Sequence, residues 1–306
     1  MSTTTTSTEA MAQAIVHAHR DTLALPVAAG TPAPAPASDD PVFVAALQAA
    51  HALGFIDADA LCVARAWSKR TRRVGHFDPA HWPDEPADFD MAPFPRQNAF
   101  APCPQALGLY AVMPDAAWTI RMARAGVPTV QLRFKSGDAA AIRAEVRATV
   151  AGVQGTGARL FINDHWQEAI DAGAYGVHLG QEDLQAMTPE GLAAIRGAGL
   201  RLGLSTHGYA EMLVADSHSP SYIALGAVFP TTLKQMATAP QGTGRLRAYA
   251  ALLRDTPRVA IGGIDLGRLP EVLKADVGSV GVVRALMAAN DLDAAVAAWN
   301  AALTPA

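Results

Sequence analysis

The feature that most constrains this chain is a regular alternation, from residue 105 onward, of short apolar runs with Ala-rich stretches long enough to form helices. Eight apolar runs occur, at residues 107–112, 129–134, 159–162, 175–179, 201–205, 222–226, 258–262 and 279–283. Strands that alternate with helices pair in parallel through right-handed crossovers. Eight such units in about 200 residues predict an α/β fold, a (β/α)8 TIM barrel.

An open, doubly wound sheet is the structural alternative for the same alternation. It is disfavoured because no Gly-rich dinucleotide fingerprint follows the first run. Half of the residues are hydrophobic and 17% are charged, so the chain can bury a large core. This composition excludes a globally disordered chain.

The first hundred residues lie outside the barrel pattern. Residues 1–40 are rich in Thr, Ala and Pro, which predicts a flexible or polyproline-like lead. Residues 41–70 are apolar at helical spacing and predict two helices, the second starting at Asp57 or Asp59. The chain therefore divides into a lead (1–40), a helical and Pro-rich extension (41–104) and a barrel (105–306).

Residues 75–104 are rich in proline and aromatic side chains, which predicts an ordered but irregular segment lying on a neighbouring surface. Trp82, Phe89 and Phe94 are expected to be buried there, because large aromatic side chains dominate packed cores.

The charge pattern limits the classes of partner. A net charge of −4 argues against a general nucleic-acid binder, which usually carries a basic patch. The basic cluster within residues 65–73 is followed by acidic residues at 84–90, and we expect it to be a solvated helix face. No apolar run reaches the roughly 18 residues of a membrane span, and the N-terminus lacks a secretory pattern. A cytoplasmic protein is the expectation, with a homo-oligomer left open.

Candidate site residues gather where a barrel carries its chemistry, at the C-terminal ends of the strands. Gln131, Arg133 and Lys135 alternate at the end of the second run, so they share a face that points into the barrel. Cations there need an anionic partner. The partner is either a bound anion or, as the alternative, a core carboxylate.

Two carboxylates stand at the ends of neighbouring strands. Asn163-Asp164 ends the third run, and Asp183 follows the fourth. Paired carboxylates with nearby oxygen donors suit a hard cation such as Mg²⁺, which usually takes one or two carboxylates plus substrate phosphates. The alternative is that each aspartate caps the following helix.

The remaining strand ends offer further polar groups. Ser205 ends the fifth run and either contacts a substrate or caps a helix. His178, inside the fourth run, is expected to be a satisfied core histidine, and His207 is expected to be structural, with a general base as the alternative. The loop after the sixth run carries hydroxyl and ammonium donors suited to oxyanions, unless it is a solvated loop: Thr231, Thr232 and Lys234.

Loops after strands seven and eight often form a phosphate site in such barrels. Here Gly262-Gly263 follows the seventh run, and Val283-Arg284 ends the eighth. Glycines let backbone N–H groups approach a ligand closely. Together, these residues predict a metal-assisted enzyme that acts on one diphosphate and one monophosphate compound.

Six segments carry a resemblance to a known family: VQLRFK, LFINDH, GAYGVHLGQEDL, LGLSTH, YIALGAVFPTTLK and VAIGGI. Over about residues 105–290 the chain resembles thiamine phosphate synthase. The resemblance implies a (β/α)8 transferase that joins 4-amino-2-methyl-5-hydroxymethylpyrimidine diphosphate to thiazole phosphate. It also implies a dissociative path, in which pyrophosphate leaves first with the assistance of Mg²⁺.

The resemblance also implies residue roles. The pyrimidine diphosphate would be held by Gln131, Arg133, Lys135, Asn163 and Lys234, with Ser205 near the pyrimidine and the pyrophosphate. Asp164 and Asp183 would ligate Mg²⁺. The thiazole phosphate would be held by Thr231 and the backbones of Gly263, Val283 and Arg284.

Three positions depart from the family pattern: Phe134, Leu233 and Arg284. We expect Phe134 to point away from the barrel axis, Leu233 to weaken an anion contact and Arg284 to tighten phosphate binding. Residues 39–70 faintly resemble the C-terminal helices of hydroxymethylpyrimidine phosphate kinases. The alternatives are a thiazole tautomerase-like enzyme or a non-catalytic regulatory relative of the same fold.

Overall fold

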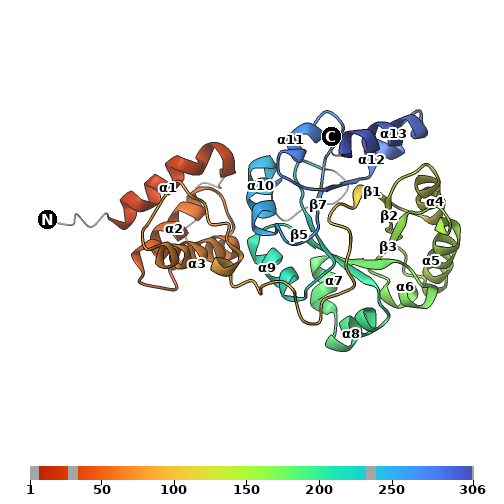
Figure 1. Ribbon diagram of the computed structural model, residues 1–306, viewed down its shortest axis with the longest axis horizontal. Coiled ribbons are helices and arrows are strands. Elements are labelled where there is room, and N and C mark those ends of the chain that lie inside the picture. The colour runs from red at the N-terminus through yellow and green to blue at the C-terminus, as the bar shows by residue number, and fades with distance from the viewer. Residues whose placement is uncertain (1–6, 27–33, 232–238, 305–306) are drawn as a thin grey trace.

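The computed structural model describes residues 7–26, 34–231 and 239–304. Figure 1 shows a barrel with a group of N-terminal helices packed beside it. Thr232 and Lys234, two of the predicted site residues, and Leu233 lie outside the described residues. No helix in the described part of the chain is long and apolar enough to cross a membrane.

Eight parallel strands close into a barrel in which each strand pairs with the next and the eighth pairs with the first, as the alternation predicts. The strands are short and almost wholly buried, as expected of a parallel sheet covered on both faces. Their bounds are β1 Gly108–Met113, β2 Thr129–Leu132, β3 Arg159–Asn163, β4 Gly176–Leu179, β5 Arg201–Thr206, β6 Tyr222–Leu225, β7 Arg258–Ile261 and β8 Ser279–Val282.

Helices follow the strands and cover the outside of the barrel (Figure 1). They are α4 Ala116–Arg124, α5 Ala139–Val153, α6 Trp166–Ala172, α7 Gln181–Ala186, α8 Pro189–Gly197, α9 Tyr209–Ser217, α10 Gly242–Leu252, α11 Leu269–Leu273, α12 Arg284–Met287 and α13 Leu292–Leu303. Side chains of Asp115, Asp138 and Asp291 cap α4, α5 and α13, so local sequence sets where these helices begin.

The N-terminal module, which we define as residues 7–26 and 34–90, packs on the barrel beside α9 and α10 (Figure 1). Its elements are α1 Thr8–Leu23, α2 Pro41–Ala52, α3 Asp57–Val74 and the 3₁₀ helix η1 Pro86–Phe89. Two helices within 41–74 confirm the prediction, and the second begins at Asp57.

The prediction of a flexible lead over residues 1–40 is wrong for the segment that forms α1. Met11 and Ile15, four residues apart, are buried on one face of this helix, and Ser7 caps its first turn. The prediction rested on the Thr- and Pro-rich composition around the segment, and overall composition does not reveal the spacing of apolar residues.

Two further expectations for the residues before the barrel need correction. The basic cluster is a solvated face only in part: Arg65, Arg72 and Arg73 are exposed, but Arg70 is only 6% exposed. Arg73 also makes two hydrogen bonds to the buried Asp88, at 2.7 and 3.0 Å. Among the three aromatic residues expected to be buried, Phe94 is 51% exposed. The Arg96 guanidinium lies 4.5 Å from the centre of its ring, so the ring packs against a cation instead of a core.

Candidate active site

A cavity of about 850 Å³ opens at the C-terminal ends of the strands, where barrels place their chemistry. Every predicted site residue that the structure describes lines this cavity, and these residues are Gln131, Arg133, Lys135, Asn163, Asp164, Asp183, Ser205, Thr231, Gly262, Gly263, Val283 and Arg284. Phe134 follows the end of β2 at Leu132; it is absent from the lining and packs against the hydrophobic core, as expected of a side chain that points away from the barrel axis.

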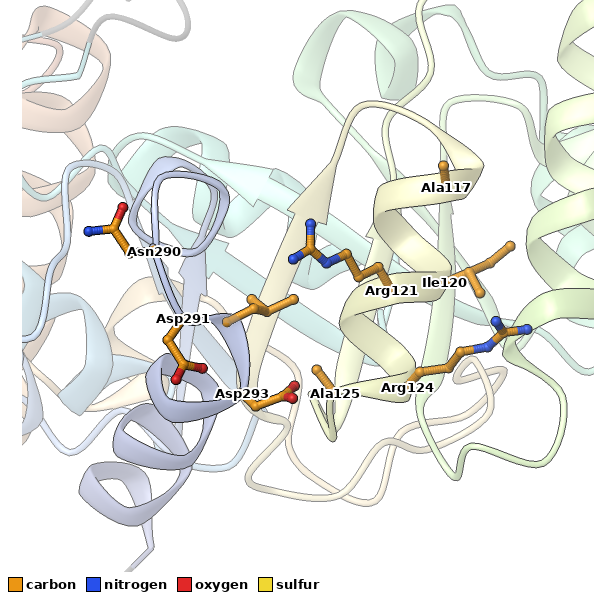
Figure 2. A pocket seen from close by; sticks show the side chains of 9 residues that line it. Ala117, Ile120, Arg121, Arg124, Ala125, Asn290, Asp291 and Asp293 are labelled. Atoms are coloured by element: carbon orange, nitrogen blue, oxygen red, sulfur yellow. The ribbon is translucent and has the colours of Figure 1, made fainter.

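A second hollow of about 810 Å³ lies on the outside of the barrel, between α4 and the start of α13. Figure 2 shows its side chains, which include Arg121 of α4 and Asp291 and Asp293 at the start of α13. None of the predicted site residues lines it. The chemistry suggested by the sequence therefore belongs to the cavity at the strand ends.

Lys135 and Asp164 form an ion pair at the rim of that cavity. The Lys135 side chain is 56% exposed and the Asp164 side chain 14%, so the pair is not the core ion pair considered as an alternative. Asp164 follows β3 with a φ of +64°, a conformation that Asp tolerates better than most residues. Its side chain does not cap α6, whose N-cap is His165. The alternative that Asp164 caps the following helix is therefore not realised, and its carboxylate faces Lys135 at the cavity rim.

Asp183 lies in the first turn of α7, with its carboxyl group beside that of Asp164. Burial raises the pKa of Asp183, and the neighbouring Asp164 carboxylate raises it further. Asp183 also accepts a hydrogen bond from the Gly180 backbone, but the N-cap of α7 is Gly180 and Asp183 is the third residue of the helix, so the alternative of an Asp183 N-cap is not realised. Two adjacent carboxylates that repel each other are a donor set that a hard cation would stabilise.

No cluster of three or more His, Cys, Asp or Glu side chains with metal-binding geometry occurs among the described residues. A cation at this rim would therefore take most of its ligands from a bound substrate and water. The two carboxylates fit Mg²⁺ in that respect, because Mg²⁺ usually binds one or two carboxylates together with substrate phosphates.

A chain of hydrogen bonds crosses the floor of the cavity. Gln131 Nε2 donates to Asn163 Oδ1 at 2.9 Å, and the Tyr110 hydroxyl donates to Gln131 Oε1 at 3.0 Å. The hydroxyls of Tyr110 and Tyr222 lie 2.7 Å apart. These four side chains come from β1, β2, β3 and β6 and are all buried, so the fold holds them in one arrangement.

The chain continues to the far wall through His178. Its Nδ1 lies 2.7 Å from the Tyr222 hydroxyl and its Nε2 lies 2.8 Å from Ser205 Oγ. Burial lowers the pKa of His178 to about 4, so the ring is neutral at pH 7. The expectation that His178 is a satisfied core histidine is confirmed.

The order of protons along this network follows from its first member. Because the Tyr110 hydroxyl donates to Gln131, Tyr222 must donate to Tyr110, and His178 must then donate from Nδ1 to Tyr222. His178 Nε2 is left as an acceptor, so the Ser205 hydroxyl donates to it. Ser205 consequently presents lone pairs to the cavity and can accept a hydrogen bond from a ligand.

Tyr110 and Tyr222 were missed in the sequence. Both occupy alternate, inward-facing positions of predicted strands, and a hydroxyl buried at such a position needs a partner. That signal could have marked them as members of a network. Its partners could not be read from the sequence, because Tyr110 and Tyr222 are separated by 112 residues.

The opposite side of the cavity is built from backbone. Gly262 and Gly263 have φ values of +106° and +64°, and a Cβ on Gly263 would lie 2.6 Å from the Pro230 carbonyl oxygen. These glycines therefore allow the loop after β6 to lie against the loop after β7, in addition to the ligand approach expected from the sequence. Arg268, which sequence reasoning missed, lines the cavity and donates to the Gly263 carbonyl at 2.6 Å.

His207 lies on the cavity wall after β5. Its Nδ1 lies 2.6 Å from Glu211 Oε2, and its backbone N–H donates to the same oxygen at 2.8 Å. The expectation of a purely structural histidine is therefore incomplete, because this ring is held by a carboxylate at the edge of the cavity.

Comparison with known proteins places this barrel in a family. The family model described as thiamine monophosphate synthase matches residues 109–286. The thiamine-phosphate synthase of Neisseria meningitidis serogroup A is 54% identical over 202 residues, which cover 66% of this chain and 97% of the relative. The thiamine-phosphate synthase of Cronobacter sakazakii is 53% identical over 192 residues, which cover 63% and 90% of the two chains.

A solved structure agrees with these sequence matches. The thiamine phosphate pyrophosphorylase from Pyrococcus furiosus superimposes with a TM-score of 0.55 at 28% identity, and it covers 64% of this chain and 95% of its own. The match to the family extends over more than half of this chain and includes all eight strands except the first residue of β1. The chain therefore belongs to the thiamine-phosphate synthase family and is a transferase of thiamine biosynthesis.

Proposed function

We propose that the chain joins 4-amino-2-methyl-5-hydroxymethylpyrimidine diphosphate to a thiazole phosphate, giving thiamine phosphate and pyrophosphate. The observation that carries this proposal is one cavity with two unlike edges. Lys135, Asp164 and Asp183 form a charged edge, and the glycine backbone after β7 forms the other. Such a cavity suits two phosphorylated compounds held side by side.

The charged edge would hold the diphosphate. Arg133 and Lys135 supply fixed positive charge, and Asp164 and Asp183 are the residues that would hold Mg²⁺. When bound, Mg²⁺ would neutralise charge that develops on the leaving pyrophosphate. Lys234 and Thr232 are proposed for the same anion site, although both lie outside the described residues.

The floor of the cavity would hold the pyrimidine ring. The proton order leaves Ser205 as an acceptor and the Asn163 amide nitrogen as a donor, and Gln131 lies between the Tyr110 hydroxyl and Asn163. An aminopyrimidine carries both an amino donor and ring-nitrogen acceptors, so it complements this pattern.

The opposite edge would hold the thiazole phosphate. Thr231 offers a hydroxyl, and the backbone at Gly263, Val283 and Arg284 lies on the cavity wall. Binding at the two edges of one cavity would bring the thiazole nitrogen toward the pyrimidine methylene carbon.

The bond changes then need no side-chain nucleophile. The bond between the methylene carbon and the diphosphate oxygen breaks, and pyrophosphate leaves with the electron pair. The lone pair of the thiazole nitrogen then forms the new bond to that carbon. Arg133 and Lys135 would stabilise the charge on the leaving group, and the site must also exclude water from the carbon cation.

The test is pyrophosphate release by the purified protein with both substrates and Mg²⁺, with EDTA as the control. The proposal expects metal-dependent release together with equal amounts of thiamine phosphate. Release without thiamine phosphate would show hydrolysis instead of transfer. Binding of thiazole phosphate with no release would contradict the proposal and favour a tautomerase-like or regulatory role.

A further inference from the structure

The N-terminal module contacts the barrel at the helix that follows the fifth strand. Asp59 of α3 is 4% exposed, and its carboxylate accepts hydrogen bonds from the backbone N–H groups of Ala210, at 2.8 Å, and Tyr209. These groups open α9, whose N-cap residue, Gly208, has no side chain to cap it. A carboxylate 151 residues away in the sequence therefore serves as the cap.

The first turn of α9 also fixes the cavity wall. Glu211 lies in that turn and binds both the backbone N–H and the Nδ1 of His207. His207 lines the cavity two residues after Ser205. Because Glu211 engages Nδ1, Nε2 is the ring nitrogen that can face a bound molecule.

Gly208 of the barrel leaves the space that the module's Asp59 occupies. Its φ of −177° is ordinary extended backbone that any residue adopts. A Cβ at this position would, however, overlap the Asp59 carboxyl group. The absence of a side chain at Gly208 is therefore explained by the approach of the module and not by the backbone conformation.

Aromatic packing surrounds the same turn. The Tyr209 hydroxyl accepts a hydrogen bond from Trp82 Nε1 at 2.8 Å, and its ring stacks on Phe89 with centroids 5.2 Å apart. Arg245 of α10 donates to the carbonyls of Leu23 and Leu53 at the ends of α1 and α2. The module thus contacts α9 through its first residues and also contacts the neighbouring helix.

The barrel chemistry of the family does not account for this arrangement, because the matched relatives correspond to about two thirds of this chain. We propose that the N-terminal module is part of the active-site support, with Asp59 as a positioning residue that holds the His207–Glu211 pair against the cavity. This inference rests on the proposed function of the cavity. Because His207 lines the same cavity as Arg133 and Lys135, the ligand group that it would meet under this inference is a phosphate oxygen of the substrate pair.

The test compares Asp59→Ala with Asp59→Asn, which keeps an oxygen acceptor for the Ala210 N–H group. We expect Asp59→Ala to raise a substrate KM about fivefold with a smaller change in kcat, the factor that corresponds to one cap of about 1 kcal/mol. Asp59→Asn should stay within about threefold of the wild type. Asp57→Ala is the matched control, because Asp57 lies in the same turn of α3 with its side chain 65% exposed.

A second pair of variants keeps the inference testable if Asp59→Ala folds poorly. Gly208→Ala should raise KM in the wild-type background, because the added methyl group displaces the carboxylate. In the Asp59→Ala background the same change should add little, because coupled sites are not additive. Additive effects of the two substitutions would overturn the inference.

One measurement does not depend on catalytic turnover. The ¹⁵N shifts of the His207 ring, with and without inorganic pyrophosphate, should change in Asp59→Ala and Gly208→Ala but not in Asp57→Ala. A lower melting temperature in Asp59→Ala with unchanged KM and unchanged His207 shifts would show a merely structural cap. A wild-type chain that releases no pyrophosphate would instead sink the proposed function, while the His207 shifts would still test the link to Asp59.

Discussion

At the scale of single residues, charged side chains lie at the rim of the cavity and neutral hydrogen-bonding groups lie on its floor. Lys135 and Asp164 form an ion pair at the rim, while the neutral His178 lies in a proton-ordered network on the floor. A leaving anion needs the charged rim, and a neutral heteroaromatic ring needs the directional groups of the floor. The two sets are therefore expected to respond differently to substitution.

Removing rim charge should affect turnover far more than folding. Lys135→Ala and Asp164→Ala are each expected to lower kcat by about 10²- to 10³-fold, because each removes a group that stabilises developing charge. Steady-state kinetics and circular dichroism would check this. Lys274→Ala, which removes an exposed lysine on the outside of the barrel, should leave kcat unchanged. Near-normal turnover in both rim variants would refute the assignment.

Breaking the floor network should affect both stability and substrate affinity. Tyr222→Phe leaves the His178 Nδ1–H group and the Tyr110 hydroxyl without their partner, at an expected cost of about 1 to 3 kcal/mol. The proton order around Ser205 is then no longer fixed, so KM for the pyrimidine substrate should rise. Tyr175→Phe, immediately before β4 and outside the cavity lining, is the matched control. Equal effects of both changes on KM would contradict the network.

At the scale of elements, the junction between α3 and α9 places a carboxylate in a buried position. Burial raises the pKa of Asp59 from its usual 3.8 to about 6, against the opposing effects of the N–H donors and Arg245. Other ionisable groups around it are Glu211, Tyr209, Tyr249 and Cys62. The free-energy cost of burying the ionised Asp59 carboxylate therefore depends on pH.

The sign of that dependence is fixed by the raised pKa. The native state holds the Asp59 proton up to about pH 6, and the unfolded chain releases it near 3.8, so this group favours folding at low pH and loses that contribution as pH rises between these values. Relative to Asp59→Asn, the wild type should lose up to about 3 kcal/mol of unfolding free energy across this window. Urea denaturation of both proteins from pH 4 to pH 7 measures the difference. A constant difference would mean that the pKa of Asp59 is not raised.

At the scale of the whole molecule, this barrel has a surface that its family relatives do not need to share. Tyr209 is fully buried and Arg245 is 2% exposed, and both make contacts with the module. The connecting segment beyond the module has its own anchor, because Arg96 binds Asp216 at 2.6 Å. The module and this segment can therefore be separated by experiment.

A chain truncated to residues 91–306 should retain the barrel and its connecting segment but uncover the faces of α9 and α10. Exposing the aromatic and aliphatic groups there should cost about 3 to 5 kcal/mol, since each large apolar side chain contributes roughly 1.5 to 3 kcal/mol. The melting temperature is then expected to fall by roughly 10 °C. Calorimetry measures this, and an unchanged melting temperature would show that the module is an independent appendage.

The sequence by itself determined the barrel and the identity of its rim residues. Strand alternation, caps such as Asp115, and polar residues at strand ends such as Asp164 are all local patterns, and parallel pairing brings the strand ends to one edge. The helix α1 was missed although its signal is also local, because a Thr- and Pro-rich composition was weighed above the spacing of Met11 and Ile15.

Only the tertiary structure decided which distant groups meet. The Tyr110–Tyr222 link and the Asp59 cap of α9 join residues that are 112 and 151 positions apart. Periodicity tells which face of an element is buried, but it does not tell what lies against that face. The proton order on the cavity floor and the capping of α9 by Asp59 therefore depend on packing between elements. The sequence pattern of each element does not say which other element lies beside it.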